Sequence, residues 1–172
     1  MSILNVELKA KSTNHDVLRE VLRVNGAVSH GIDHQVDTYF RVNHGRLKLR
    51  EGNIENNLIH YVRTDIAGPK SSHIILYQSD PDSSLKALLT AANGVLVVVD
   101  KQREILYIDH VKFHIDTVKD LGQFVEIEAI DTSGSIGRAK LEEQCNYYRD
   151  LLGIRDVDLV SESYSDLIIK GS

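Results

Sequence analysis

Several short segments of this chain alternate between charged and apolar residues. In the segment Asn5–Lys11, the charged side chains alternate with Val6, Leu8 and Ala10. The same alternation recurs in Arg46–Arg50, Lys112–Asp116 and Phe124–Glu128, and Lys101–Arg103 likewise places two cations on one face, on either side of Gln102. Successive side chains of a strand point to opposite faces, so each segment is predicted to be a strand with one apolar face and one charged face. The pattern therefore favours a largely β fold in which one sheet face is dry and the other carries charge.

The charged faces are sorted by sign. Cations gather on four of the segments, whereas carboxylates gather near the two ends of the chain. If such a sheet closes into a barrel, the charged faces converge on one lumen that contains many cations and a few carboxylates. Arginine and lysine bind phosphate groups and carboxylates bind divalent metals, so this lumen suits a polyphosphate with its metal ion. The alternative is a solvated sheet face on which opposite charges pair across strands.

The composition indicates a local anion site rather than a basic surface. The chain has 172 residues, of which 42% are hydrophobic, and this is enough for one domain with one core. Its net charge is −5, so the overall charge predicts no DNA partner and no anionic membrane partner. Ten of the 20 lysines and arginines nevertheless lie in or beside the predicted strands. Such a concentration of cations in an acidic chain is what a binding site for an anion requires.

The cysteine content and the apolar segments indicate the cellular compartment. Cys145 is the single cysteine, so the chain cannot form an intrachain disulfide or a cysteine-based zinc site, which fits a reducing environment. The first residues do not resemble a signal peptide, and no apolar run approaches about 18 residues. We therefore expect a cytoplasmic protein. Its oligomeric state stays open between a monomer and a homodimer, because no exposed apolar stripe in the sequence identifies an interface.

Turn and capping signals divide the chain into strands and helices. About eight strands are predicted, over residues 3–11, 28–41, 46–51, 58–65, 72–78, 95–101, 103–108, 111–118 and 124–131. The segments 95–101 and 103–108 are predicted to turn about Gln102, with one long strand as the alternative. Helices are predicted from Asn14 to Gly26, from Pro81 to Gly94, and over residues 136–152 and 164–169. Mostly antiparallel strands with peripheral helices make an α+β fold, and eight strands can close into a barrel that holds one small ligand.

Nine segments, in this order, are similar to those of the CYTH superfamily, the triphosphate tunnel proteins that include class IV adenylyl cyclases and thiamine or inorganic triphosphatases. They are Asn5–Lys11, Gln35–Phe40, Gly45–Glu51, Tyr61–Arg63, Gly68–Lys70, Lys101–Arg103, His114–Asp116, Leu121–Glu128 and Ser163–Leu167. The resemblance covers almost the whole chain and implies one CYTH-like domain over residues 1–172. It also implies an eight-stranded antiparallel closed tunnel that binds a triphosphate.

The resemblance further implies roles for individual residues. The triphosphate would be bound by Lys9, Lys48, Arg50, Arg63, Lys70, Lys101 and Arg103. The metal, Mg²⁺ or Mn²⁺, would be bound by Glu7, Glu126 and Glu128. Lys9, Arg50 and Glu126 would contribute most to catalysis. Further candidates near the ligand are Asn5, Lys11, Lys112, His114 and Asp116.

One position departs from the pattern of the superfamily. The first glutamate of its N-terminal Glu-x-Glu-x-Lys element is Asn5 in this chain. An asparagine carbonyl can still ligate a hard cation, but it carries no charge and cannot act as a base. The departure therefore argues against a second metal, or a water molecule activated by that carboxylate. One metal site remains expected, because Mg²⁺ needs only one or two carboxylates beside phosphate and water oxygens.

Several of these residues also have a structural interpretation. Glu126 and Glu128 could form salt bridges with lumen cations, although such pairs would neutralise the site. Asp37 is more typical of a turn or strand contact than of a catalytic residue, and Tyr39 is more typical of a core. Tyr164 lies where a C-terminal helix could dock or close one mouth of the tunnel.

Three functions share this expected lumen. In a metal-dependent triphosphatase, water attacks a terminal phosphorus of inorganic triphosphate, thiamine triphosphate or a nucleoside triphosphate such as ATP. In a class IV adenylyl cyclase, the ribose 3′-hydroxyl attacks the α-phosphorus of ATP and releases pyrophosphate. A non-catalytic protein would bind a nucleotide, polyphosphate or the 5′-triphosphate end of RNA. Hydrolysis is favoured because it requires no oriented nucleoside, and the chain has few aromatic residues for an adenine site.

Overall fold

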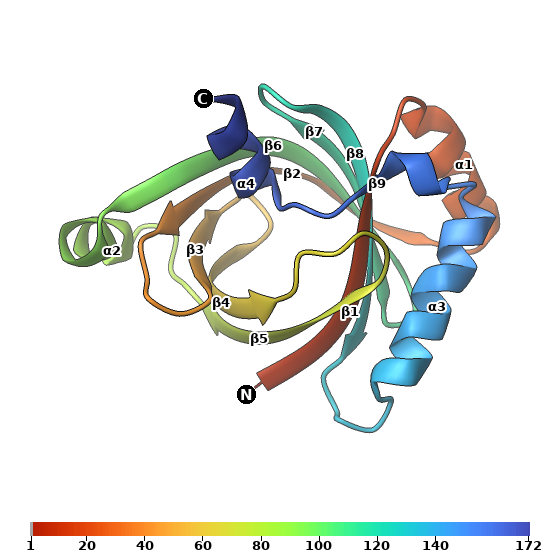
Figure 1. Ribbon diagram of the computed structural model, residues 1–172, viewed down its shortest axis with the longest axis horizontal. Helices are drawn as coiled ribbons and strands as arrows, with labels where there is room; N and C mark the ends of the chain where they lie inside the picture. The colour runs from red at the N-terminus through yellow and green to blue at the C-terminus, as the bar shows by residue number, and fades with distance from the viewer. Residues whose placement is uncertain (1) are drawn as a thin grey trace.

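The computed structural model describes residues 2–172, in which eight strands close into a barrel (Figure 1). Around the ring the order is β1, β5, β4, β3, β2, β6, β7 and β8, every neighbouring pair is antiparallel, and β8 pairs with β1 to close it. The strands are β1 (Ser2–Lys11), β2 (Val28–Phe40), β3 (Arg46–Glu51), β4 (Asn56–Arg63), β5 (Lys70–Gln78), β6 (Val95–Ile108), β7 (Val111–Val118) and β8 (Gly122–Asp131). A short extra strand, β9 (Leu159–Val160), pairs with the end of β1. This architecture confirms the predicted α+β fold with a closed barrel.

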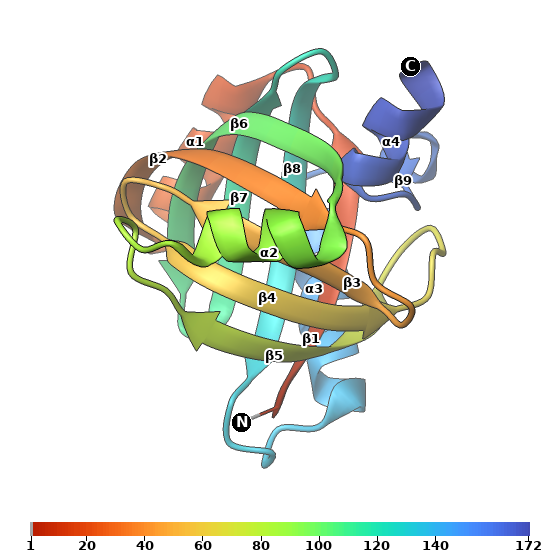
Figure 2. The same ribbon diagram turned by 90° about the vertical axis from the view of Figure 1, so that its left-hand side faces the viewer.

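Four helices lie outside the barrel wall (Figures 1 and 2). They are α1 (His15–Val24), α2 (Leu85–Asn93), α3 (Arg138–Leu151) and α4 (Tyr164–Gly171). As predicted, Asn14 caps α1, its side chain accepting the backbone N–H of Val17 at 3.2 Å. Ser163 caps α4 in a capping box with Asp166. Within residues 2–172, no helix is both long and apolar enough to cross a membrane.

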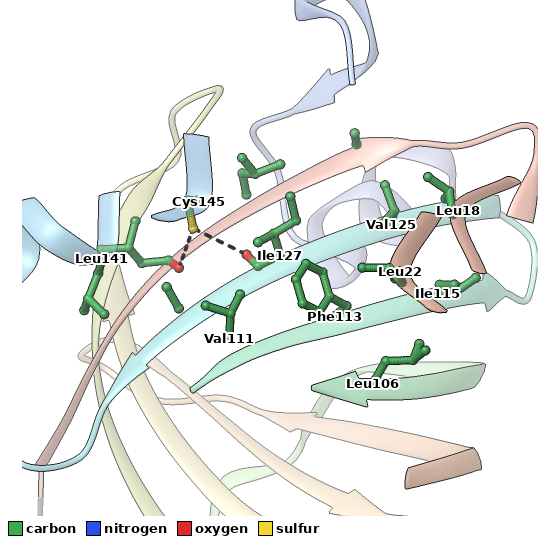
Figure 3. Close-up of a cluster of buried hydrophobic side chains, with 14 residues drawn as sticks. Leu18, Leu22, Leu106, Val111, Phe113, Ile115, Val125, Ile127, Leu141 and Cys145 are labelled. Atoms are coloured by element: carbon green, nitrogen blue, oxygen red, sulfur yellow. Dashed lines mark hydrogen bonds between the residues drawn. The ribbon is translucent and has the colours of Figure 1, made fainter. Parts of the chain in front are cut away.

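The larger hydrophobic core lies between the barrel wall and the helices α1 and α3 (Figure 3). From the barrel it contains Val6, Leu8, Ala10, Leu106, Val111, Phe113, Ile115, Val125, Ile127 and Ala129, and from the helices Leu18, Leu22, Leu141 and Cys145. Burial raises the pKa of the Cys145 thiol to about 12, so this residue behaves as a small apolar group. Because the apolar residues of β1, β7 and β8 point outward into this core, the charged residues between them point into the barrel.

A second apolar cluster covers one end of the barrel. Tyr39 and Tyr61 of the barrel wall pack in it with Val160 of β9 and Tyr164 of α4. The Tyr164 ring lies 5.0 Å from the ring of Phe124, measured between centroids. The Tyr164 hydroxyl also donates to Asp116 at 2.7 Å, so Tyr164 docks the C-terminal helix on this end of the barrel, which is the first of the two roles that the sequence left open for it.

Most predicted strands and helices agree with the structure to within about two residues at each end, but two elements differ by more. β6 is one unbroken strand, because Gln102 pairs with β2 on one side and with β7 on the other. The helix α2 begins at Leu85 instead of Pro81. Residues 80–83, which precede the helix, form a turn in which the backbone carbonyl oxygen of Asp80 accepts the N–H of Ser83 at 3.2 Å. Proline thus occupies the turn rather than the first position of the helix.

Candidate functional site

The lumen of the barrel is a hollow lined mainly by polar side chains. It contains about 160 Å³ of open volume, roughly five times the share of one water molecule in the liquid, so it is not a packed core. Seven lysine or arginine side chains line it, and so do five carboxylates. They are Lys9, Lys48, Arg50, Arg63, Lys101, Arg103 and Lys112, with Glu7, Asp37, Glu55, Glu126 and Glu128. The lumen therefore has an excess of positive charge in an acidic protein.

Three of these cations converge on Asp37, near the C-terminal end of β2. The Asp37 Oδ2 atom lies 2.8 Å from Lys101 Nζ and 2.9 Å from Arg50 Nη2. Lys48 Nζ lies 3.3 Å from the same oxygen. Burial by itself raises the pKa of Asp37, but the three cations outweigh it and hold the pKa well below its usual range. Burial also lowers the pKa of Lys101 to about 7, against the opposing effect of Asp37. Asp37 is therefore the common counter-ion of three lumen cations.

A second carboxylate, Glu126 on β8, gathers another group of charges. Its Oε2 atom lies 3.1 Å from Arg103 Nη2 and 3.0 Å from His114 Nδ1, and its Oε1 atom lies 3.4 Å from Lys9 Nζ. Asp116, buried on the same face of β7 as His114, holds the same arginine through contacts of 2.8 and 2.7 Å. Burial alone raises the pKa of Glu126, but Arg103 and then Lys9 bring it well below its usual range. Glu126 is therefore ionised and fixes the positions of its neighbours.

Arg63, on β4, reaches the lumen with part of its guanidinium unbonded. Its Nη1 atom donates to Glu7. Its buried Nε and Nη2 atoms have no hydrogen-bond partner among residues 2–172, although Nε lies 3.5 Å from Asp65 Oδ1. Three other polar atoms of lumen residues in the described part of the chain, Asn5 Oδ1, Ser72 Oγ and His114 Nε2, are also buried without a partner. Buried unbonded donors such as Arg63 Nε and Nη2 are costly, so this part of the lumen favours a ligand that supplies oxygen acceptors.

The carboxylates expected to bind a metal fall into two places. Glu7 on β1 and Glu128 on β8 lie directly opposite each other in the β1–β8 ladder. Asn5 lies beside them, where its Nδ2 atom donates to Glu128 Oε1 at 2.6 Å and its Oδ1 atom is buried with no partner among the described residues. Such oxygen atoms fit Mg²⁺ or Mn²⁺. Glu126 is instead surrounded by cations. No cluster of three histidine, cysteine or acidic residues within 2–172 forms a ready metal site, so Asn5 and ligand oxygens would complete the coordination.

Glu55 is a lumen residue that the sequence did not reveal. It lies in the turn between β3 and β4, which the sequence presents as a polar loop. The turn folds inward because the Asp33 carboxylate accepts the backbone N–H groups of residues 53–55, at 2.7, 2.9 and 2.9 Å. Glu55 consequently reaches Arg50, at 3.1 Å. The available signal was the alternation along β2, which places Asp33 on the same face as Asp37.

The remaining predicted residues are divided between the lumen and its surroundings. Lys112 and His114 line the lumen, as expected of residues that share a face. Lys70 is buried but does not line it, because its Nζ atom donates to the carbonyl oxygen of Ser161 at 2.9 Å and ties the C-terminal segment to the barrel. Lys11 is exposed at the end of β1. The structure thus brings together six of the seven predicted triphosphate ligands.

A closed eight-stranded tunnel with a cationic lumen is the architecture of the triphosphate tunnel proteins. The CYTH domain matches residues 4–164, and the chain therefore belongs to the CYTH family. No curated protein matched the chain.

Solved structures share this fold. Protein PH1012 from Pyrococcus horikoshii OT3 is 21% identical with a TM-score of 0.77, over 95% of this chain and 98% of the other. A candidate adenylate cyclase from Vibrio parahaemolyticus is 18% identical with a TM-score of 0.78, over 96% of this chain and 98% of the other. HpAC1 from Hippeastrum is a candidate adenylyl cyclase described as having a dominant triphosphatase activity. It is 14% identical with a TM-score of 0.66, over 100% of this chain and 97% of the other. At these identities the likeness establishes the fold.

Proposed function

We propose that this protein is a metal-dependent phosphohydrolase that hydrolyses a triphosphate inside the cationic tunnel. The observation that carries the proposal is Arg63, which lines the lumen and whose guanidinium has two buried nitrogen atoms without a hydrogen-bond partner among residues 2–172. An arginine fork pairs well with phosphate oxygens, and a partly dry lumen strengthens the interaction. Membership of the CYTH family and the triphosphatase activity described for HpAC1 support the same class of substrate.

The two carboxylate-centred clusters would hold the triphosphate between them. One cluster consists of Asp37 with Lys48, Arg50 and Lys101, and the other of Glu126 with Lys9 and Arg103. The carboxylates keep the cations in place before the substrate arrives, so little rearrangement is needed when phosphate oxygens join them. Phosphoryl transfer depends mainly on such positioning and on electrostatic stabilisation.

Glu7, Glu128 and Asn5 would hold the divalent metal. When bound, Mg²⁺ or Mn²⁺ supplies positive charge to the phosphate oxygens. Glu7 now pairs with Arg63, so its engagement by a metal would release that arginine toward the phosphates. The binding of the metal and the binding of the triphosphate are therefore expected to favour each other.

His114 would accept the proton of the attacking water molecule. The ionised Glu126 carboxylate only accepts hydrogen bonds, so His114 Nδ1 carries the hydrogen of their 3.0 Å contact. Burial, reinforced by Arg103, lowers the pKa of His114. The ring is then neutral near pH 7 and its Nε2 atom carries a lone pair at the lumen. Water placed between Nε2 and the terminal phosphate would lose its proton to this nitrogen.

The test is to incubate purified protein with inorganic triphosphate, thiamine triphosphate or ATP, each with Mg²⁺ and with Mn²⁺. Orthophosphate without cyclic AMP is the expected product. Arg63→Gln should lower kcat/KM by about 100-fold, whereas Arg155→Gln, which alters an exposed pair outside the barrel, should not. Cyclic AMP with equimolar pyrophosphate would make the protein a cyclase, and triphosphate binding without any product would make it a non-catalytic binder.

A further inference from the structure

One wall of the lumen differs chemically from the others. The lumen-facing side chains of β1, β3, β7 and β8 are mainly charged, whereas β4 and β5 contribute Ile59, Ile74 and Leu76. Ile59 and Leu76 pair directly across the β4–β5 ladder, and Ile74 lies two residues away on the same face of β5. These three residues, the apolar strip, form one continuous surface. Inorganic triphosphate is charged along its whole length and has no apolar surface to bury against this strip.

The strip leads to the more open end of the lumen. At the end covered by α4, the lumen residues Tyr39, Tyr61 and Tyr164 are only 5%, 8% and 5% exposed. Leu76 also lines the lumen, but it is 43% exposed. Figure 2 shows α4 on the right, whereas β5, near whose end Leu76 lies, finishes on the left. A ligand with an extended group therefore has room at the Leu76 end.

Packing alone explains part of the strip but not all of it. Ile59 and Ile74 also contact the buried cluster around Tyr61, so a structural role accounts for them. Leu76 lies outside both buried clusters formed by the described residues. A half-exposed leucine that faces into a charged lumen gains little from that position unless an apolar group covers it.

The register of β4 relates the strip to the phosphate-binding cations. Along the inner face of β4, Arg63 lies toward the end covered by α4, Tyr61 and Ile59 follow, and Asn57 lies nearest the other mouth. Ile59 is also paired with Lys48 across the β3–β4 ladder, so the strip begins beside the cations. From these relationships we infer that the substrate is an organic triphosphate, with its phosphates among the cations and its organic group on the apolar strip at the open mouth. This inference rests on the proposed function of the same tunnel.

The polar residues at the mouth narrow the class of the organic group. Asn57 offers an amide beside the strip, and the Glu55 carboxylate, with a side chain that is 19% exposed, lies near the same end. An apolar surface bordered by an amide and a carboxylate suits a flat heterocyclic group with hydrogen-bonding edges, as in a nucleoside. A plain alkyl chain would leave the Asn57 amide without a partner.

The experiment compares Leu76→Asn with Tyr77→Asn, using ATP, thiamine triphosphate and inorganic triphosphate as substrates. Tyr77 is the matched control, because it is the next residue on β5 and is 64% exposed. Wild-type protein should prefer an organic triphosphate over the inorganic one. Leu76→Asn should lower kcat/KM for that organic substrate roughly tenfold, with little change for inorganic triphosphate, and Tyr77→Asn should behave as wild type. Dissociation constants from calorimetry and the unfolding temperature complete the comparison.

Each outcome decides a separate question. A preference for inorganic triphosphate, or an equal loss for all substrates in Leu76→Asn with the fold intact, would overturn the inference while leaving the proposed hydrolysis standing. Absence of hydrolysis of all three substrates would contradict the proposed function. The dissociation constants would then still test the inference, since equal or tighter binding of the inorganic triphosphate would overturn it.

Discussion

Glu7 and Glu128 lie directly opposite each other across the β1–β8 ladder, with both side chains at the lumen. Like charges at such positions destabilise a sheet unless other charges or donors compensate them. Arg63 compensates Glu7, and the Asn5 amide compensates Glu128. The pair therefore concentrates negative charge at one place in an otherwise cationic lumen, and a divalent metal would bind there.

Replacing Glu128 with glutamine should weaken Mn²⁺ binding by about tenfold or more, because one of the two opposed carboxylates is lost. The fold should be retained, since a glutamine oxygen can still accept from Asn5. Calorimetric titration with Mn²⁺ measures the affinity, and the unfolding temperature without metal should equal or exceed that of the wild type. Glu143→Gln, on the exposed side of α3, is the control. Wild-type Mn²⁺ affinity in the Glu128 variant would place the metal elsewhere.

Lys101 should make triphosphate binding depend on pH. Burial lowers its pKa from 10.5 to about 7 in the free protein, so much of this charge is lost above neutral pH. A bound triphosphate raises the pKa again, because the anion favours the charged ammonium. Binding should therefore take up protons near pH 8 and weaken as the pH rises beyond 7.

Calorimetry near pH 8 in two buffers with different ionisation enthalpies measures this uptake. The binding enthalpy should differ between the buffers for the wild type and differ less for Lys101→Arg, since arginine stays charged throughout this range. Identical enthalpies in both buffers for the wild type would show that Lys101 keeps its proton in the free protein.

Removing the Asp37 charge should destabilise the ligand-free protein. Asp37→Asn leaves Lys48, Arg50 and Lys101 without their common counter-ion, at a cost of about 3 kcal/mol in the free energy of unfolding. Inorganic triphosphate should recover more stability in this variant than in the wild type, because phosphate oxygens replace the lost charge. Denaturant unfolding with and without triphosphate tests both effects, with Asp100→Asn as an exposed control. An unchanged free energy of unfolding would show that the cation cluster does not depend on Asp37.

The proton-accepting role of His114 predicts a change in turnover without a matching change in binding. His114→Gln can keep a hydrogen bond to Glu126 but offers no basic nitrogen at the lumen, so kcat should fall by about 100-fold. The dissociation constant for the substrate should stay nearly unchanged. Single-turnover kinetics and calorimetry separate the two quantities. His110→Gln, whose ring contacts Gln144 outside the barrel, is the matched control. A variant that turns over substrate as fast as the wild type would remove His114 from the mechanism.

The identity of the lumen-facing residues followed from local geometry. Lys9, Lys48 and Glu126 line the lumen because each lies between apolar residues on a strand, and the alternation of a strand fixes the face of every side chain. Turn signals such as Gly45, with a positive φ of 65°, placed the ends of several strands correctly. These features depend on neighbours in the sequence and needed no knowledge of the closed barrel.

The sequence by itself, through its alternation of charged and apolar residues, determined a sheet that can form a barrel and that has one cationic face. Only the tertiary structure decided which charges meet: three cations share Asp37, Glu55 enters the lumen, and Lys70 turns away to the C-terminal segment. The turn that carries Glu55 is held by Asp33, which lies about 20 residues earlier in the chain. Alternation specifies the face on which a side chain lies, whereas its partners depend on strand register and on closure of the ring, which bring residues distant in sequence within hydrogen-bonding distance.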